Sequence, residues 1–365
     1  MRALEWLRAR HDVSLVPSPE YKPVPAASGG RASALGREGT RAIRARLQPA
    51  YLRQERVAVD ELIRLGQSFD WIWLAQWPLS WSVTVVPSWR SRGVFVSWDE
   101  DALSRSRWTS AKALAIRRPI RSATRLIAAG TAMTAERRHL STMSLVVARS
   151  PVDATWLRRV QRAPVATLAN TVDLRLFQGL KSASDAQPVA LFVGSDYEPN
   201  VDGIEWFLRT VWTRVQTRRP EARLLIVGNR MERFAGRWSR ESVEVVGHVP
   251  DVRPYFEASR IVVCPVFYGG GSPLKLLEAA AAARPVVTTR YCARAVEDRK
   301  HAMDVPTSRA AWADAILKYL DDPAVSRTAG EHLRAAVATT HDVLRWEWQM
   351  AAIESSALEG ASSTP

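Results

Sequence analysis

The chain has 365 residues, of which 47% are hydrophobic, and a formal net charge of +14. This length and apolar content suit two domains with sizeable cores. The two cysteines, Cys264 and Cys292, are too few for a disulfide framework and indicate a reducing cytosol.

The positive charge is concentrated in the first half of the chain. Residues 1–180 hold 28 Lys and Arg against 14 Asp and Glu, whereas residues 181–365 hold 23 of each. The two halves therefore predict two domains with different surfaces. A basic half favours contact with anionic lipid head groups, nucleic acid or an acidic substrate. The alternative is an arginine bias spread over solvated helices.

The N-terminal region offers no signal peptide, because MRALEWLRARHD is amphipathic and charged and lacks an apolar central run. Residues 71–89 form an uncharged segment that approaches the length of a membrane span. Gln76, Pro78 and Pro87 favour strand, loop and helix there over a transmembrane helix.

Apolar runs bounded by turn residues predict strands that alternate with helices in both halves. The predicted strands of the first half are 11–16, 69–75, 93–98, 143–148 and 165–169. Those of the second half are 189–194, 222–228, 243–249, 260–266 and 284–289. Helices are predicted at 200–217, 251–258, 273–283, 308–320 and 324–339. Residues 17–40 are predicted to be a loop and residues 174–188 a linker.

The stretch FYGGGSPLKLLEAAAAARPVVTT, residues 267–289, places three glycines before an Ala-rich helix. Ser272 is the predicted N-cap, and Pro273 suits the first turn. Because the first N–H groups of a helix have no partner within the helix, its N-terminus beside Gly269, Gly270 and Gly271 is a place for an anion.

Lys275 and Glu278 are three residues apart and share one face of this helix. The ammonium group can meet phosphate oxygens, while the carboxylate accepts hydrogen bonds from ribose hydroxyls. The pattern thus predicts a site for a nucleotide diphosphate. The alternative is a helix that packs closely on a sheet, with glycines that only turn the chain.

Two further patterns are weaker. Asp99-Glu100-Asp101 has the spacing with which some transferases hold a diphosphate through a divalent ion, but a solvated loop after a strand is the favoured interpretation. No His or Cys spacing fits zinc. The tryptophans of the first half could stack on a sugar acceptor or lie at a membrane interface, and core packing is favoured for Trp71 and Trp73.

Several ordered blocks of the second half resemble the nucleotide-binding domain of group 1 glycosyltransferases with the GT-B fold. These blocks are LFVGSDYEPNVDGIEWFLRTVW, ARLLIVGN, VEVVGHVPDVRPYFEAS and IVVCPVFYGGGSPLKLLEAAAAARPVVTT. In the first half, FDWIWLAQ, VSWDEDALSRSR, ERRHLSTMSLVVARSPVDATWL and LANTVDL are similar to pieces of the acceptor domain in one branch of that family. The resemblance spans nearly the whole chain.

The resemblance implies an α/β protein with two Rossmann-like domains whose parallel sheets face a central cleft. Residues 1–173 would bind the acceptor, 174–188 would be the linker, and 189–340 would bind the sugar nucleotide. Residues 341–365 would form a C-terminal helix and tail that crosses back to the first domain.

The resemblance also assigns roles to individual residues. Lys275 would contact the donor phosphates and Glu278 the ribose hydroxyls, and these two are the expected catalytic residues. Gly194 would let the donor approach, while Gly247 and His248 would line the base pocket, although turn or solvated-loop roles are the alternative for these three. The remaining donor-binding residues would be Gly269, Gly270, Gly271 and Ser272. No metal and no cofactor are expected.

The chain departs from the family pattern at three places. The family often pairs two glutamates, and Gly270 stands where the first would be, with Glu278 at the second. Trp73, Gln76 and Trp77 stand where many members carry a histidine. The segment MRALEWLRARHDVSLV resembles the first helix and second strand of the family with nothing before them. We therefore expect the genomic sequence upstream of the Met1 codon to encode, in frame, an apolar strand and a Gly-rich turn.

The sequence therefore predicts a retaining glycosyltransferase of the hexosyltransferase type. It would move a sugar from a nucleotide-diphosphate sugar to a glycan or lipid-linked hydroxyl acceptor in cell-envelope or exopolysaccharide synthesis. The expected location is the cytoplasm, with peripheral contact to an anionic membrane surface on its inner face. The alternatives are a noncatalytic sugar-nucleotide or glycan-binding partner protein and, less favoured, a nucleic-acid-binding protein, for which no recognised module occurs.

Overall fold

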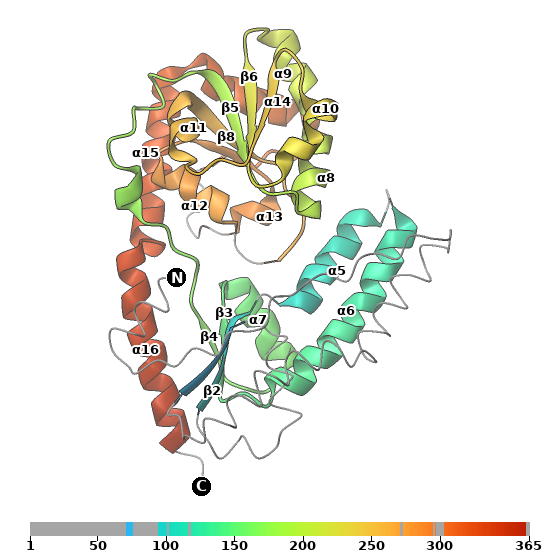
Figure 1. Ribbon diagram of the computed structural model, residues 1–365, viewed down its shortest axis with the longest axis vertical. Helices are drawn as coiled ribbons and strands as arrows, with labels where there is room; N and C mark the ends of the chain where they lie inside the picture. Colours follow the sequence, from blue (N-terminus) through green and yellow to red (C-terminus); the bar gives the residue numbers. More distant parts are fainter. Residues whose placement is uncertain are drawn as a thin grey trace. The chain divides into compact units, whose positions relative to one another are not determined.

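The protein divides into two compact units, each with a parallel sheet (Figure 1). Unit 1 comprises Met1–Leu168 and Glu347–Pro365, and unit 2 comprises Ala169–Trp346. The computed structural model describes residues 71–75, 94–100, 102–115, 118–270, 273–294, 296 and 303–362. The strand predicted at 11–16 and the loop predicted at 17–40 lie outside these ranges.

The described part of unit 1 contains four parallel strands in the order β1-β2-β3-β4. Its elements are β1 (Trp71–Ala75), β2 (Val94–Glu100), α5 (Leu103–Leu114), α6 (Pro119–Leu140), β3 (Leu145–Ala148), α7 (Pro151–Val160) and β4 (Val165–Thr167). The four strands predicted for this part of the sequence are therefore confirmed.

The prediction of a loop at Asp99-Glu100-Asp101 is wrong for its first two residues. Asp99 and Glu100 belong to β2, and Glu100 pairs with Ala148 of β3 after an irregularity in the register between Ser97 and Glu100. Asp101 lies outside the described residues. Within the described ranges, no group of three or more His, Cys, Asp or Glu side chains could hold a metal ion.

Unit 2 contains a five-stranded parallel sheet in the order β7-β6-β5-β8-β9. The strands are β5 (Gln187–Val193), β6 (Arg223–Val227), β7 (Val243–Gly247), β8 (Ser259–Cys264) and β9 (Val286–Thr288). The strand order reverses between β5 and β8, and open α/β sheets bind ligands outside the carboxyl ends of the strands at such a reversal.

The helices of unit 2 connect these strands and cover both faces of the sheet (Figure 1). They are η2 (Leu174–Phe177), α8 (Glu198–Phe207), the π-helical η3 (Leu208–Trp212), α9 (Thr213–Arg218), η4 (Met231–Phe234), α10 (Ala235–Trp238), α11 (Arg253–Ala258), α12 (Leu274–Ala281), α13 (Arg290–Ala293), α14 (Arg309–Asp321) and α15 (Pro323–Thr340). The last helix, α16 (Val343–Ser362), contains the boundary between Trp346 and Glu347. No helix in the described ranges is long and apolar enough to cross a membrane.

The core of unit 2 explains why its strands could be read from the sequence. Every residue of β8 is buried, as expected for a central strand covered on both faces. On α12, Leu276 and Leu277 are fully buried, and so are the alanines up to Ala281. Small side chains let this helix lie close to the sheet.

The ends of α12 differ from the prediction. Pro273 has an extended conformation and occupies the N-cap position, so the helix begins at Leu274. The helix ends because Ala283 has a left-handed backbone with φ of 51°. The amide of Arg284 donates to the carbonyl of Ala279 over 2.9 Å and closes a Schellman motif, in which glycine normally takes the left-handed position.

Gly330 of α15 packs against this helix end. A β-carbon at position 330 would lie 2.0 Å from the carbonyl oxygen of Ala283, so the close approach of α15 depends on glycine. The motif that ends α12 is therefore held from outside by α15.

We expect Gly330→Ala to lower the free energy of unfolding by about 1–3 kcal/mol, the usual cost of overpacking. Urea unfolding followed by circular dichroism measures this change. Gly236→Ala in α10 is the matched control, because no atom lies within 4 Å of its added β-carbon. An equal loss of stability in both variants would contradict the proposed contact.

Candidate functional site

The carboxyl ends of the strands in unit 2 bring the predicted site residues into one region. Gly194 directly follows β5, the glycines lie between β8 and α12, and Lys275 lies in the first turn of α12. These segments flank the reversal of strand order between β5 and β8. We call the group of Gly194, Asn200, Lys275 and Glu278 the switch-point site.

Lys275 reaches from α12 to the turn that follows β5. Its Nζ donates a hydrogen bond of 2.6 Å to Oδ1 of Asn200 and lies 4.7 Å from the centre of the Phe192 ring. Asn200 is buried, and its Nδ2 donates to the carbonyl of Ser195 over 3.0 Å. Because both ends of its amide are engaged, Asn200 fixes the ammonium group against the β5–α8 turn.

Gly194 makes room for this ammonium group. A β-carbon at position 194 would lie 2.9 Å from Lys275 Nζ and 3.0 Å from Asn200 Nδ2. The backbone on its other side is equally close, because a β-carbon at Gly228 would lie 2.0 Å from the carbonyl oxygen of Gly194. The positive charge thus lies directly against main chain at the carboxyl end of the sheet.

Glu278 lies one helical turn after Lys275 and is partly buried. Burial raises the pKa of its carboxyl above the ordinary value, and the nearby charge of Lys275 opposes this shift. Within the described residues, no hydrogen-bond donor of the protein contacts this carboxylate.

The glycine loop is tied to α8 at its start. Tyr268 is buried and donates a hydrogen bond of 2.6 Å from its hydroxyl to Oδ2 of Asp202. Gly269 is buried with φ of 142°, and Gly270 is partly exposed. Gly271 lies outside the described residues, as does Ser272.

The loop after β7 lies beside the loop after β6. Gly247 is the last residue of β7, and a β-carbon there would lie 2.8 Å from Oε2 of Glu232. The next residue, His248, is exposed. Gly228 donates its amide to the carbonyl of Gly247 over 2.7 Å, so the ends of β6 and β7 are joined.

Two arginines after β6 contact an acidic residue after β5. Oδ2 of Asp196 lies 3.1 Å from Nε of Arg230 and 3.0 Å from Nη1 of Arg233. The guanidinium groups remain more than half exposed, whereas Asp196 is 20% exposed. The cluster adds cationic groups to the ligand-binding edge of the sheet.

Sequence reasoning missed Asn200, Asp196, Arg230 and Arg233. Each follows the end of a predicted strand by only a few residues, which is the one signal in the sequence that could have singled them out. Asn200 and Lys275 are 75 positions apart in the sequence, so no local spacing could have predicted their hydrogen bond.

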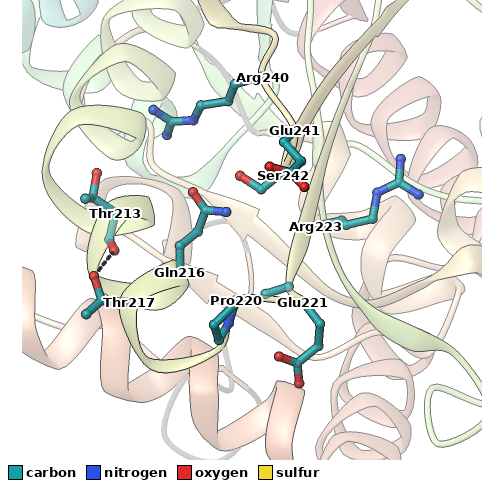
Figure 2. A pocket seen from close by; sticks show the side chains of 10 residues that line it. Thr213, Gln216, Thr217, Pro220, Glu221, Arg223, Arg240, Glu241 and Ser242 are labelled. Atoms are coloured by element: carbon teal, nitrogen blue, oxygen red, sulfur yellow. Dashed lines mark hydrogen bonds between the residues drawn. The ribbon is translucent and has the colours of Figure 1, made fainter.

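A hollow of about 770 Å³ lies at the opposite ends of β6 and β7 (Figure 2). Arg223, the first residue of β6, and Ser242, which precedes β7, line it together with residues of α9. Arg223 contacts Glu244 over 2.9 Å, and Arg240 donates to the carbonyl of Leu208 over 3.4 Å. Because parallel α/β sheets bind ligands at the carboxyl ends of their strands, we assign no ligand to this hollow.

The switch-point site combines a fixed cation, the N-terminus of α12 and the carboxylate of Glu278. The first two suit an anion, because backbone N–H groups and an ammonium group both stabilise negative charge. The carboxylate suits a hydroxyl donor about one helical turn away. Together they fit a molecule that carries a phosphate group next to hydroxyl groups.

Comparison with known proteins gives a family match for part of unit 2. Residues 187–322 match the family model described as glycosyl transferases group 1, so the resemblance read from the sequence is confirmed for this part of the chain. A search of curated proteins returned no match.

Solved structures confirm the GT-B fold. Sucrose-phosphate synthase from Thermosynechococcus elongatus has a TM-score of 0.59 at 20% identity, covering 79% of this chain and 73% of that chain. HepE from Anabaena in complex with UDP and glucose has a TM-score of 0.61 at 16% identity, covering 82% and 81%. An α,α-trehalose 6-phosphate synthase from Burkholderia multivorans has a TM-score of 0.61 at 14% identity, covering 86% and 75%.

The contact between Asn200 and Lys275 predicts a response to charge. Asn200→Asp places a carboxylate against the ammonium group, so we expect the affinity for inorganic pyrophosphate to fall by roughly 1–3 kcal/mol in calorimetry. Asn229→Asp is the control, because it adds the same charge at an exposed position after β6. Equal losses in both variants would indicate a general charge effect and contradict the specific contact.

The raised pKa of Glu278 predicts how stability depends on pH. Because the folded-state pKa exceeds the ordinary value of 4.5, the contribution of Glu278 to the free energy of unfolding is largest below that value and declines as pH rises through the raised pKa. Glu278→Gln removes this decline. We therefore expect the variant to be more stable than the native protein at neutral pH and equally stable below pH 4.5, as measured by urea unfolding. A variant less stable than the native protein at neutral pH would contradict this.

Proposed function

Because unit 2 matches the group 1 glycosyltransferases and the chain has the GT-B fold, we propose that this protein transfers a sugar from a nucleotide-diphosphate sugar to a hydroxyl acceptor. The transfer retains the configuration at the sugar carbon and uses no metal and no other cofactor. The acceptor is a glycan or a lipid-linked saccharide of the cell envelope or an exopolysaccharide. The similar HepE structure, which is in complex with UDP and glucose, supports a donor of this class.

The position of Lys275 carries this proposal. Its ammonium group is held by the neutral Asn200, which leaves the positive charge available for the donor phosphates. Backbone N–H groups of the loop at Gly270, Gly271 and Ser272 add donors to the same phosphates. These groups stabilise the negative charge that develops on the leaving diphosphate, and groups that are positioned in advance need not reorganise during the reaction.

The other residues of the site orient the donor. The Glu278 carboxylate accepts hydrogen bonds from the ribose hydroxyls. Gly194 and Gly269 let the donor approach the backbone, and Gly247 and His248 line the pocket for the base. Holding the donor at several points fixes its reactive carbon relative to the acceptor.

The reaction needs no protein nucleophile in this scheme. The bond between the sugar carbon and the diphosphate oxygen breaks as the acceptor oxygen bonds to the same face of that carbon. The proton of the acceptor hydroxyl passes to a phosphate oxygen of the leaving diphosphate. Lys275 stabilises the diphosphate, so the leaving group also serves as the base.

The proposal extends to domain roles and location. Residues 1–173 bind the acceptor, 174–188 form the linker, and 189–340 bind the donor, with 341–365 returning to the first domain. The protein works in the cytoplasm and on the inner face of an anionic membrane, and nucleic acid is not a partner. The excess of basic residues in the first half supports the membrane contact.

A second candidate function is a noncatalytic sugar-nucleotide-binding protein. It is favoured by Gly270, which stands where the family often has the first of two glutamates. Incubation with a panel of sugar nucleotides and cell-envelope lipid extract, with mass spectrometry of the products, separates the two functions. A glycosylated product supports transfer, whereas donor binding without any product supports the second candidate.

We expect Lys275→Ala to weaken nucleotide-diphosphate binding by about 1–3 kcal/mol in calorimetry, the range for a charge-assisted hydrogen bond. Glu278→Gln should weaken sugar-nucleotide binding and leave pyrophosphate binding largely intact, because its partner is the ribose. Unchanged affinity in Lys275→Ala would contradict the phosphate contact. Equal losses for both ligands in Glu278→Gln would contradict the ribose contact.

A further inference from the structure

Helices α5 and α6 of unit 1 pack side by side (Figure 1). Both helices expose large apolar side chains. We call residues 103–140 the α5–α6 hairpin. Trp108 is 41% exposed, Ile120 57%, Leu126 43%, Ile127 60% and Met133 45%. Large apolar side chains that are exposed together can mark a site that contacts a protein or a membrane.

The exposed residues of α6 differ in charge between the middle and the ends of the helix. From Ala123 to Thr134, the one charged residue of this helix is Arg125, which is partly buried, and the fully exposed residues are uncharged. Exposed arginines lie at both ends, with Arg121 before this segment and Arg137 and Arg138 after it. The most exposed side chains in the middle of the helix are thus uncharged and include Leu126, Ile127 and Met133, with exposed cations at both ends and the partly buried Arg125 between them.

The acidic side chain of the hairpin is buried. Glu136 is the one acidic residue of the hairpin, and it is 2% exposed. The amide of Ser104 donates to its Oε1 over 2.8 Å, and the hydroxyl of Ser104 donates to its Oε2 over 2.5 Å. Trp156 of α7 donates to the same hydroxyl over 2.8 Å. The hairpin is therefore fixed to α7 by its inner side, and its outer side carries only neutral and positive groups.

This arrangement fits a bilayer surface better than nucleic acid. A nucleic-acid surface places cations at its centre to meet a row of phosphates. Here the centre is apolar and the cations flank it, as in helices that lie in the membrane interface with their apolar face among the acyl chains. The flanking arginines then lie at the level of the lipid head groups.

We propose that the α5–α6 hairpin docks the protein on an anionic lipid bilayer, with α6 lying in the plane of the interface. The inference rests on the proposed function in one respect, because docking brings the enzyme to a lipid-linked acceptor. The apolar middle of α6 inserts at the boundary between head groups and acyl chains. Arg121, Arg137 and Arg138 bind the anionic head groups.

Vesicle flotation tests the proposal with the full chain. We expect the protein to float with vesicles of phosphatidylcholine and phosphatidylglycerol and to stay at the bottom with phosphatidylcholine alone. Leu126→Glu should reduce binding by about tenfold or more, because it puts a charge into the inserted face. Arg138→Gln should reduce binding about fivefold, the effect of one basic residue near an anionic surface.

The chain offers matched controls for both substitutions. Leu344→Glu changes a leucine of α16 that is 65% exposed, and Arg327→Gln changes an exposed arginine of α15. Both should bind vesicles like the native protein. Losses as large as those of Leu126→Glu and Arg138→Gln, or no flotation of the native protein, would overturn the proposal.

Two further measurements test whether this face binds a second copy of the chain or nucleic acid instead of a bilayer. A native dimer that Leu126→Glu converts to a monomer in light scattering, without vesicle binding, would make this face an interface between two copies and overturn the proposal. Binding to nucleic acid with a steep salt dependence, again without vesicle binding, would also overturn it. Calorimetry with a nucleotide diphosphate should give the same affinity for Leu126→Glu and the native protein, so a failure of the donor site is distinguishable from a failure of docking.

Discussion

The ammonium group of Lys275 lies so close to Gly194 that a β-carbon at this position would be only 2.9 Å from Nζ. Any residue other than glycine would therefore crowd the ammonium group. The β5–α8 turn can meet α12 only because this side chain is missing. Gly228 continues the constraint, since its own missing side chain admits the carbonyl of Gly194. Two glycines that directly follow the neighbouring strands β5 and β6 thus let the cation of α12 reach the carboxyl edge of the sheet.

The position of α12 depends in turn on its surroundings. Its leucines and alanines are buried against the sheet, and its last turn is closed by a left-handed alanine that α15 covers through Gly330. A helix held at one end by packing and at the other by the contact of Lys275 with Asn200 has little freedom to tilt. This is what an electrostatic site requires, because groups fixed in advance need no reorganisation when charge develops.

The strands and most helices could be predicted because buried parallel strands are continuous apolar runs and because their connections repeat. The ends of α12 could not. Pro273 takes an extended conformation just outside the helix, and the left-handed Ala283 is hidden in a run of alanines that shows no glycine stop signal. Lys275 and Glu278 could be proposed from their spacing on one helix. Asn200 could not, because the order of β5 and β8 in the sheet brings it to Lys275.

The partner that holds Lys275 is an amide, which hydrogen-bonds the ammonium group without neutralising it. An ion pair would confine the field of the lysine to its partner, whereas an amide leaves that field to extend over roughly 8–10 Å at physiological ionic strength. On the proposed function, capture of the donor at this edge of the sheet would begin at a distance, and its rate would fall as salt is added. The same field would attract small polyanions, and a donor that also contacts Glu278 would displace them because it makes the second contact.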